Sequence, residues 1–188
     1  MEAFLKTLRH LQIIIIALAA GLIVLAAVMI YMVLHLKPAG FIGGQGPQWN
    51  GVPLLTALFL GIGALNLFLS FVIPLLILKT QTAQWAKQAK PIEGELTTWE
   101  TSDLTWLDRV PTETLSKLLT IFQSSRIVAV ALCEAAGMMC VIAYLLEAHL
   151  PSLVMVGISI ALMLIRVPTQ STLSNWVFGH IEQLKLAK

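Results

Sequence analysis

Glu134 is the residue whose type and position most suggest chemistry. It lies near the middle of residues 127–146, an apolar run that holds no other charged side chain. In a spanning helix that rises 1.5 Å per residue, this position is ~4 Å from the centre of the run. An ionised carboxylate at that depth of a membrane costs on the order of 3 kcal/mol. We therefore expect Glu134 to face the protein interior, to be protonated, or both.

Polar side chains in the other apolar runs are candidate partners for this carboxylate: Asn66, Ser70 and Ser159. Asn66 and Ser70 recur at helical spacing, so they share one face of the second run. Two interpretations are open. In the first, Glu134 is a hydrogen-bonded interior acid that fixes the helix register, with Asn66 as its first partner. In the second, Glu134 carries a proton or a cation, and the three polar groups coordinate the ion.

Small residues indicate where helices are expected to pack. Ala131 and Gly137 lie beside Glu134, Gly63 shares the face of Asn66, and Gly157 lies in the last apolar run. Lipid is as apolar as leucine, so helices in a membrane associate where small side chains let their backbones approach closely. We expect all four small residues at helix–helix contacts.

Long apolar runs determine the expected architecture. The chain of 188 residues is 57% hydrophobic and 12% charged, whereas a soluble domain has about 25% charged residues. Apolar runs of about 18 or more residues predict spanning helices. We expect an all-α, polytopic membrane protein that forms a left-handed four-helix bundle. Its two transmembrane hairpins are residues 1–78, with spans at about 11–34 and 53–78, and residues 126–168, with spans at about 126–147 and 151–167.

Basic residues indicate the orientation of these spans. Lys and Arg precede the first run, lie between the second and third runs, and follow the fourth, whereas the opposite side has only Lys37. Cytoplasmic segments carry an excess of Lys and Arg. We therefore expect a multi-pass protein of the bacterial inner (plasma) membrane with both termini in the cytoplasm. Arg166 closes the fourth run, and we expect its side chain to reach the membrane surface from there.

Three segments lie outside the expected spans. The connection 37–53 holds five glycines and three prolines, which oppose regular structure. Residues 79–125 are expected to form a cytoplasmic segment whose last helix has an apolar stripe and continues into the third span. Residues 169–188 are expected to form an amphipathic helix on the membrane surface. Tryptophans of the last two segments favour headgroup anchoring or contact with a partner protein, and the candidate docking residues are Trp85, Trp99, Trp106 and Trp176.

Motifs of several enzyme classes are missing from the sequence. It has no phosphate-binding glycine loop, Cys-x-x-Cys pair, His-Glu-x-x-His helix or nucleophile elbow. We therefore expect no enzyme activity and no cofactor. His35 and His149 end runs of equivalent direction, so a metal or haem site there is conceivable, but nothing else resembles a ligand set and we expect no metal. A net charge of +2, with the basic residues at the ends of the runs, argues against nucleic acid as a partner.

The sequence resembles two groups of proteins, one locally and one over the whole chain. The segment ALCEAAGMMCVIAYLL resembles the carboxylate-bearing helix of rotary ATP synthase proteolipids, which implies that Glu134 is an ion-carrying carboxylate. The chain departs from that family because its second run lacks the glycine repeat and because the acid lies on the first helix of its hairpin. The whole chain is similar to small four-span bacterial membrane proteins of no established activity, in which an Arg precedes the Glu (Arg126 here) and a Pro-Thr pair closes the last span (Pro168-Thr169 here). That similarity implies a fold and no chemistry.

These observations lead to one principal hypothesis and one alternative. The principal hypothesis is a non-enzymatic integral membrane protein, a subunit or accessory scaffold component of a larger membrane complex. Its partners would be the lipid bilayer and other membrane-protein chains, in a homo- or hetero-oligomer. The alternative is a proton- or cation-translocating helical bundle that uses Glu134 as its carrier.

Overall fold

The described part of the chain is almost entirely α-helical. The computed structural model describes residues 2–36, 48–49, 52–88 and 110–186. The helices are α1 (Glu2–Tyr31), continued by the π-helical turn η1 (Met32–Leu36), α2 (Leu54–Gln88), α3 (Thr112–Glu147), α4 (Leu150–Ile165) and α5 (Gln170–Leu186). The all-α prediction is therefore confirmed for these residues.

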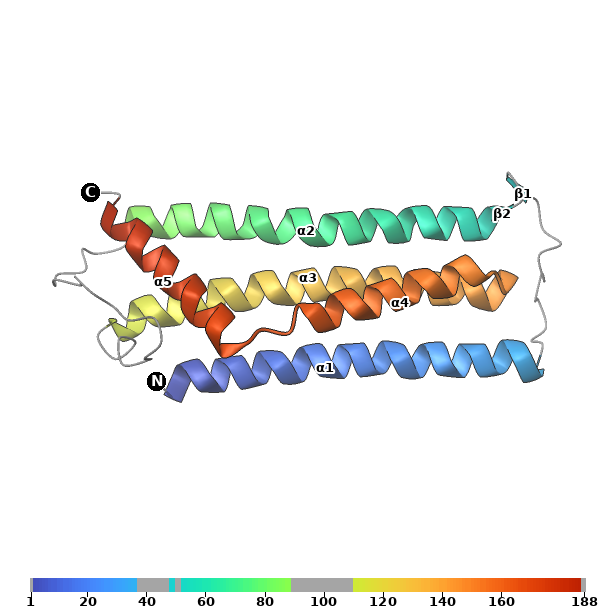
Figure 1. Ribbon diagram of the computed structural model, residues 1–188. Coiled ribbons are helices and arrows are strands. Elements are labelled where there is room, and N and C mark those ends of the chain that lie inside the picture. Colours follow the sequence, from blue (N-terminus) through green and yellow to red (C-terminus); the bar gives the residue numbers. More distant parts are fainter. Residues whose placement is uncertain (1, 37–47, 50–51, 89–109, 187–188) are drawn as a thin grey trace.

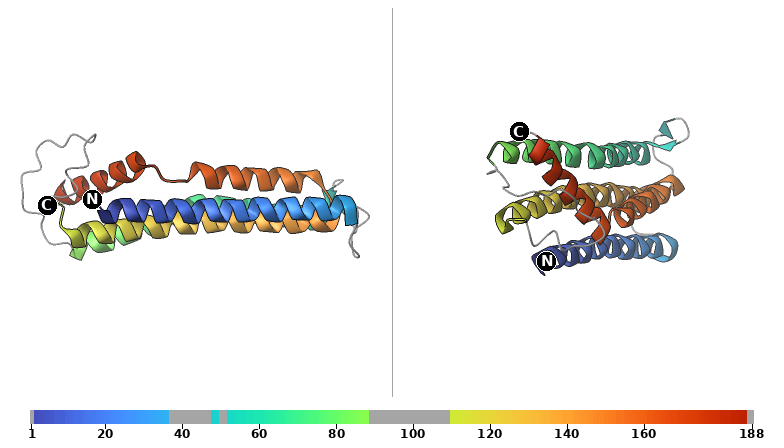
Figure 2. Two further views of the ribbon diagram at one scale, coloured as in Figure 1. Left: turned by 90° about the horizontal axis from the view of Figure 1, so that it is seen from below. Right: turned by 60° about the vertical axis from the view of Figure 1, so that its left-hand side comes forward.

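The helices form a layer of three with a fourth helix stacked on it. Helix α3 lies between α1 and α2, and α4 lies over one face of this layer, mainly against α3 (Figure 1, Figure 2). We call the end that carries the start of α1 and the end of α5 the proximal end, and the end with the turn between α3 and α4 the distal end. No described helix covers the other face of the layer (Figure 2). The predicted first hairpin is therefore not a packed pair, because α3 separates α1 from α2.

Helix α1 packs through a narrow apolar seam. Its buried residues recur at spacings of three or four, which is the period of a helix that packs along one stripe. The opposite side of α1 is also apolar but exposed, as at Val24, which is 62% exposed. Local sequence therefore predicts the helix, and packing selects its buried stripe: Phe4, Leu8, Leu11, Ile15, Ala19, Leu22 and Ala26.

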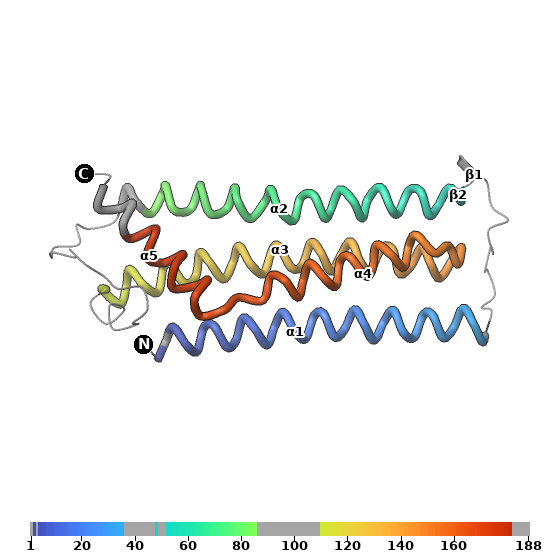
Figure 3. The backbone as a smooth tube through the Cα atoms, viewed as in Figure 1, coloured from blue at the N-terminus to red at the C-terminus, as the bar shows by residue number. Residues whose placement is uncertain are grey.

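Of the helices that the structure describes, three are long and apolar enough to cross a membrane: those within Phe4–His35, Leu54–Trp85 and Thr112–Glu147. A fourth span is reached only if α4 and α5 are counted as one bent element, with an angle of 66° at the break between them (Figure 3). Alone, α4 is short for a span, because its 16 residues extend ~24 Å at 1.5 Å per residue. The hydrocarbon core of a bilayer is about 30 Å thick.

The proximal end continues the helical packing beyond the predicted spans. As predicted, the helix that begins after residue 111 runs without a break into the third apolar run, forming the 36-residue α3. The apolar stripe at the start of α3 is buried, for example at Leu118 and Phe122. Helix α5 lies against it, and Val177 and Ile181 are buried. The sequence predicts an amphipathic helix on the membrane surface over residues 169–188, but the apolar stripe of α5 that contains Val177 and Ile181 packs within the protein instead.

The connection between α1 and α2 contains a short element that its composition does not predict. Strands β1 (Gln48–Trp49) and β2 (Val52–Pro53) pair antiparallel, with Gln48 opposite Pro53 and Trp49 opposite Val52. The residues between them in sequence are Asn50 and Gly51, the dipeptide most typical of two-residue hairpins. The prediction that this connection lacks regular structure is thus wrong at these four residues.

Gly137 lies where α1 packs tightly against α3. A Cβ atom added at Gly137 would lie 2.5 Å from Cδ2 of Leu22, and Leu22 is fully buried. We expect Gly137→Ala to lower the free energy of unfolding by about 1–3 kcal/mol because the core must shift. Thermal unfolding of the purified protein in mild detergent measures the effect.

Gly157 provides the matched control, because nothing lies within 4 Å of a Cβ added there. We expect Gly157→Ala to leave stability unchanged or to raise it by up to about 1 kcal/mol through helix propensity. In a protein that already carries Leu22→Ala, the further change Gly137→Ala should cost much less stability than it does in the native chain. The smaller alanine at residue 22 leaves the space that the new methyl group needs. Equal effects of alanine at the two glycines would contradict the packing described here.

Candidate functional site

Glu134 lies at the edge of the uncovered face of the layer. Its side chain is partly exposed, and it makes no hydrogen bond to any residue that the structure describes. Ala131 and Met138, one helical turn before and after it, are both exposed, and residues at these spacings are surface neighbours on a helix. Gly137, on its other side, contacts α1 through Leu22. The carboxylate is therefore flanked by α1 on one side and by the open face on the other.

The expected partners of Glu134 lie on another side of α3. Ser70 is buried, donates to the carbonyl of Leu67 at 2.6 Å, and accepts a hydrogen bond from Sγ of Cys133 at 3.5 Å. Successive residues of an α-helix point about 100° apart, so the side of Cys133 that meets Ser70 is not the side of Glu134. Ser159 is also buried and donates to the carbonyl of Met155 at 3.0 Å.

Asn66 is partly buried, and the structure gives it no hydrogen bond to Glu134 or to any other described residue. The predicted cluster of Glu134 with Asn66, Ser70 and Ser159 is thus not brought together. Two of the three polar groups face the interior of the bundle, as expected, but their hydrogen bonds go to the backbone of their own helices and to Cys133.

Two of the four predicted packing residues lie at close helix contacts. Gly63 meets α3, where an added Cβ would lie 3.0 Å from Sγ of Cys140, and Gly137 meets α1 as described above. Ala131 is exposed, and Gly157 has open space around it. Neither of these last two lies at a close contact between the described helices, because α3 and α4 turn other residues toward their neighbours.

Arg166 is placed differently from its predicted position at the membrane surface. It caps the end of α4, yet its side chain is 8% exposed. The terminal nitrogen Nη1 donates to the backbone carbonyl of Ala129 at 2.9 Å and to Sγ of Cys133 at 3.0 Å. The guanidinium carbon lies 4.4 Å from the centre of the Phe71 ring on α2. Arg166 therefore turns inward and ties α4 to both α3 and α2.

Glu147 is the buried acid that sequence analysis missed. It ends α3 at the distal end, is 4% exposed, and its Oε2 accepts a hydrogen bond from the backbone N–H of Thr56 at 2.6 Å. Thr56 lies in the first turn of α2, whose free N–H groups favour a negative charge. A signal was available in the sequence, because a carboxylate at the C-terminal end of its own helix is unfavourable there and requires a partner elsewhere.

Within the described part of the chain, three other polar atoms at the distal end are buried without a hydrogen-bond partner: Oγ1 of Thr56, Nδ1 of His149 and Oγ of Ser152. All three belong to Glu147's neighbourhood, since Thr56 binds that carboxylate and the other two follow it in the turn into α4. Buried polar groups without partners cost free energy. The distal end therefore concentrates polar groups that the apolar composition of the runs conceals.

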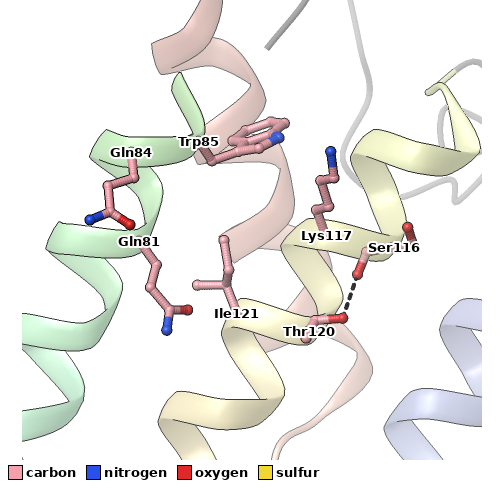
Figure 4. Close-up of a pocket in the computed structure, with 7 residues that line it drawn as sticks. All are labelled: Gln81, Gln84, Trp85, Ser116, Lys117, Thr120 and Ile121. Atoms are coloured by element: carbon pink, nitrogen blue, oxygen red, sulfur yellow. Dashed lines mark hydrogen bonds between the residues drawn. The ribbon is translucent and has the colours of Figure 1, made fainter. Parts of the chain in front are cut away.

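Trp85 and Trp176 pack within the protein. Trp85 is 9% exposed and forms one wall of a groove of about 420 Å³ between α2 and α3 at the proximal end (Figure 4). The charged residue among the described residues that line the groove is Lys117, which pairs with Glu113 at 2.9 Å. Trp176 of α5 contacts the rings of Phe122 and His180 at centroid distances of 5.2 and 4.2 Å. Trp99 and Trp106, the other two predicted docking residues, lie outside the described residues.

The histidines do not form a ligand set in the described ranges. His35 is exposed and stacks on Tyr31 at 4.7 Å, while His149 is partly buried in the turn before α4. No group of three or more His, Cys, Asp or Glu side chains is arranged to hold a metal ion among residues 2–36, 48–49, 52–88 and 110–186. The polar side chains that the structure describes thus bind backbone atoms and one another. No described serine or cysteine is hydrogen-bonded to a histidine as a nucleophile is to its base.

No protein-family model matches the chain, and no curated protein or solved structure matches it either. The function has to be inferred from the placement of its own residues.

Glu147 and Glu134 are expected to differ in their effect on stability. Glu147→Met keeps the approximate volume but leaves the buried N–H of Thr56 without an acceptor, so we expect a loss of about 1–3 kcal/mol. Glu147→Gln retains an acceptor and should lose less. Glu134→Gln removes no hydrogen bond and serves as the control, with a change within about 0.5 kcal/mol. Thermal unfolding in one detergent gives the order, and a larger loss at Glu134 than at Glu147 would contradict it.

Proposed function

We propose that this chain is a non-enzymatic integral membrane protein that acts as a subunit or accessory scaffold component of a larger membrane assembly. The observation that carries the proposal is the partly exposed position of Glu134 between the exposed residues Ala131 and Met138, at the edge of the uncovered face and without a hydrogen-bond partner among the described residues. Either lipid or another protein chain must cover this face.

The uncovered face is apolar around Glu134. Met138 and Ile142 of α3 are 40% and 42% exposed, and Ala131 beside them is exposed too. A helix that projects apolar side chains in this way belongs in lipid or against another chain. In a bilayer, Glu134 would lie ~4 Å from the centre of its apolar run at 1.5 Å per residue. Since a carboxylate facing lipid there costs on the order of 3 kcal/mol, contact with a second membrane-spanning chain explains the face better than lipid does.

The distribution of basic residues supports an orientation for this proposed membrane protein. Lys6 and Arg9 of α1, Lys79 of α2 and Arg126 of α3 all belong to the proximal half of their helices. Cytoplasmic ends of spans carry an excess of such residues. We therefore propose a bacterial inner (plasma) membrane protein whose proximal end, with both termini, lies in the cytoplasm.

Ion translocation by Glu134 remains the alternative, but no contact favours it. A carrier site needs polar groups around the carboxylate, and Asn66, Ser70 and Ser159 have no hydrogen bond to it. The same placement of Glu134 at an open edge is better suited to a contact between chains.

Photocrosslinking in living cells tests the proposed assembly. A photoreactive amino acid at Met138 or Ile142 should give protein adducts, because another chain covers this face. The matched controls are Val154 and Leu164 of α4, which are 57% and 49% exposed but lie outside the face, and these should react with lipid. The Glu134→Lys variant should weaken the adducts at Met138 at least tenfold, since a charge buried in the contact without its partner costs about 1.4 kcal/mol or more. Lipid adducts at all four positions would overturn the proposal.

Reconstituted vesicles separate the alternative from this proposal. We expect an imposed pH gradient to decay at the same rate with the native chain and with Glu134→Gln, and no faster than in vesicles without protein. A gradient that collapses with the native chain and persists with Glu134→Gln would replace the scaffold role by ion translocation.

A further inference from the structure

Arg166 and Arg126 place two cations together without an opposing acid among the described residues. Arg166 reaches from the end of α4 to the carbonyl of Ala129 on α3, and Arg126 lies one turn before that carbonyl. The guanidinium carbon of Arg126 lies 5.1 Å from the centre of the Phe122 ring. Residues three apart on a helix are surface neighbours, so Arg126 lies on the side of α3 next to the carbonyl that Arg166 binds. Like charges in a partly buried site need a compensating anion.

No carboxylate of the described residues supplies that anion. The acids with described side chains are Glu2, Glu113, Glu134 and Glu147, and none forms an ion pair with either arginine. Glu134 is eight residues after Arg126, ~12 Å along the axis of α3 at 1.5 Å per residue. Glu147 lies at the distal end, and Glu113 pairs with Lys117. The two guanidinium groups therefore form an unbalanced positive charge within the described part of the chain.

Arg166 retains hydrogen-bond donors for a ligand. Both of its hydrogen bonds come from Nη1, whereas a guanidinium has five N–H donors in a planar fork. The N–H groups on Nε and on the second terminal nitrogen have no partner among the described residues. Fork-shaped donors match the oxygens of a phosphate group, and two such groups make an anion site stronger than one does.

We propose that Arg166 and Arg126 bind the phosphate group of an anionic membrane lipid. The inference rests on the membrane location proposed above, which puts Arg126 ~16 Å from the centre of the apolar run of α3, at the level of the cytoplasmic headgroups. The carbonyl that Arg166 binds lies about one helical turn deeper. Basic pockets between helices on the cytoplasmic side recognise anionic lipids. Phe71, under the guanidinium of Arg166, is 51% exposed and offers apolar surface to an acyl chain. Arg166 directly precedes residues 167–169, which form the break between α4 and α5 (Figure 3).

Native mass spectrometry of the full chain in mild detergent tests this binding with phosphatidylglycerol and with phosphatidylcholine of the same acyl chains. We expect phosphatidylglycerol to bind at least tenfold more tightly than phosphatidylcholine. Arg126→Gln should weaken phosphatidylglycerol binding about tenfold, because one charge-assisted contact is lost. Arg166→Lys should weaken it less than Arg166→Gln, because it keeps the charge and loses the fork.

Arg9→Gln is the matched control, since Arg9 is an exposed arginine at the same proximal end, and it should leave binding unchanged. If Arg166→Gln does not fold, the variant of the less buried Arg126 tests the site by itself. Equal losses for Arg9→Gln and Arg126→Gln would overturn the site, as would equal affinity for the two lipids. Competition with inorganic phosphate distinguishes a lipid site from a site for a free anion. If millimolar phosphate displaces phosphatidylglycerol completely and phosphatidylglycerol does not raise the melting temperature, the site binds a free anion and the lipid assignment is wrong.

Two readouts keep this inference separate from the proposed function. Retention of the chain in membranes after an alkaline carbonate wash tests the membrane location on which both depend. Adducts at Met138 report the face of α3 away from α4, so they should persist in Arg126→Gln. Loss of lipid selectivity with adducts intact overturns the lipid site alone.

Discussion

The close approach of three helices to α3 is the constraint on which the remaining structure depends. Helix α1 comes close at Gly137 and α2 at Gly63, where an added Cβ would collide with Leu22 or crowd Cys140. Helix α4 closes a third side with buried Ser159 and with Arg166. Small residues permit such approaches where there is no gain from removing apolar surface from water. Because three sides of α3 are taken, only its fourth side is left for a contact outside the described helices.

The charged groups along α3 have different surroundings at different positions of the helix. At the distal end, Glu147 is buried and binds the first turn of α2. Toward the proximal end, the carbonyl of Ala129 accepts the buried Arg166. Between these two levels lies Glu134, partly exposed and without a described partner. Each of the two buried charged groups thus has a hydrogen bond to the backbone of a neighbouring helix, and the charged group without one lies at the open face.

The two proposals concern different sides of the same helix. The uncovered face around Met138 and Ile142 suits another membrane chain, because it joins apolar surface to an acid that lipid would disfavour. The side toward α4 carries Arg126 and Arg166, whose unbalanced charge suits a phosphate group. A protein with both this contact face and this lipid site would bind a lipid at one depth of the membrane and a partner chain at another. Such a combination suits a scaffold and needs no catalytic group.

Sequence by itself determined the helices, the continuity of α3 and the packing roles of Gly63 and Gly137, because apolar period and small residues are local properties of a chain. Only the tertiary structure decided that α3 lies at the centre, that Ala131 and Gly157 are exposed, and that the stripe of α5 packs on α3. The partners of Glu147 and Arg166 were also hidden, since a backbone N–H or carbonyl has no signature in the sequence. The physical reason is that a helix apolar on all sides has several equivalent faces. Which face meets a neighbour is settled by contacts between residues far apart in the chain, and these contacts turned Glu134 away from the three polar groups expected to bind it.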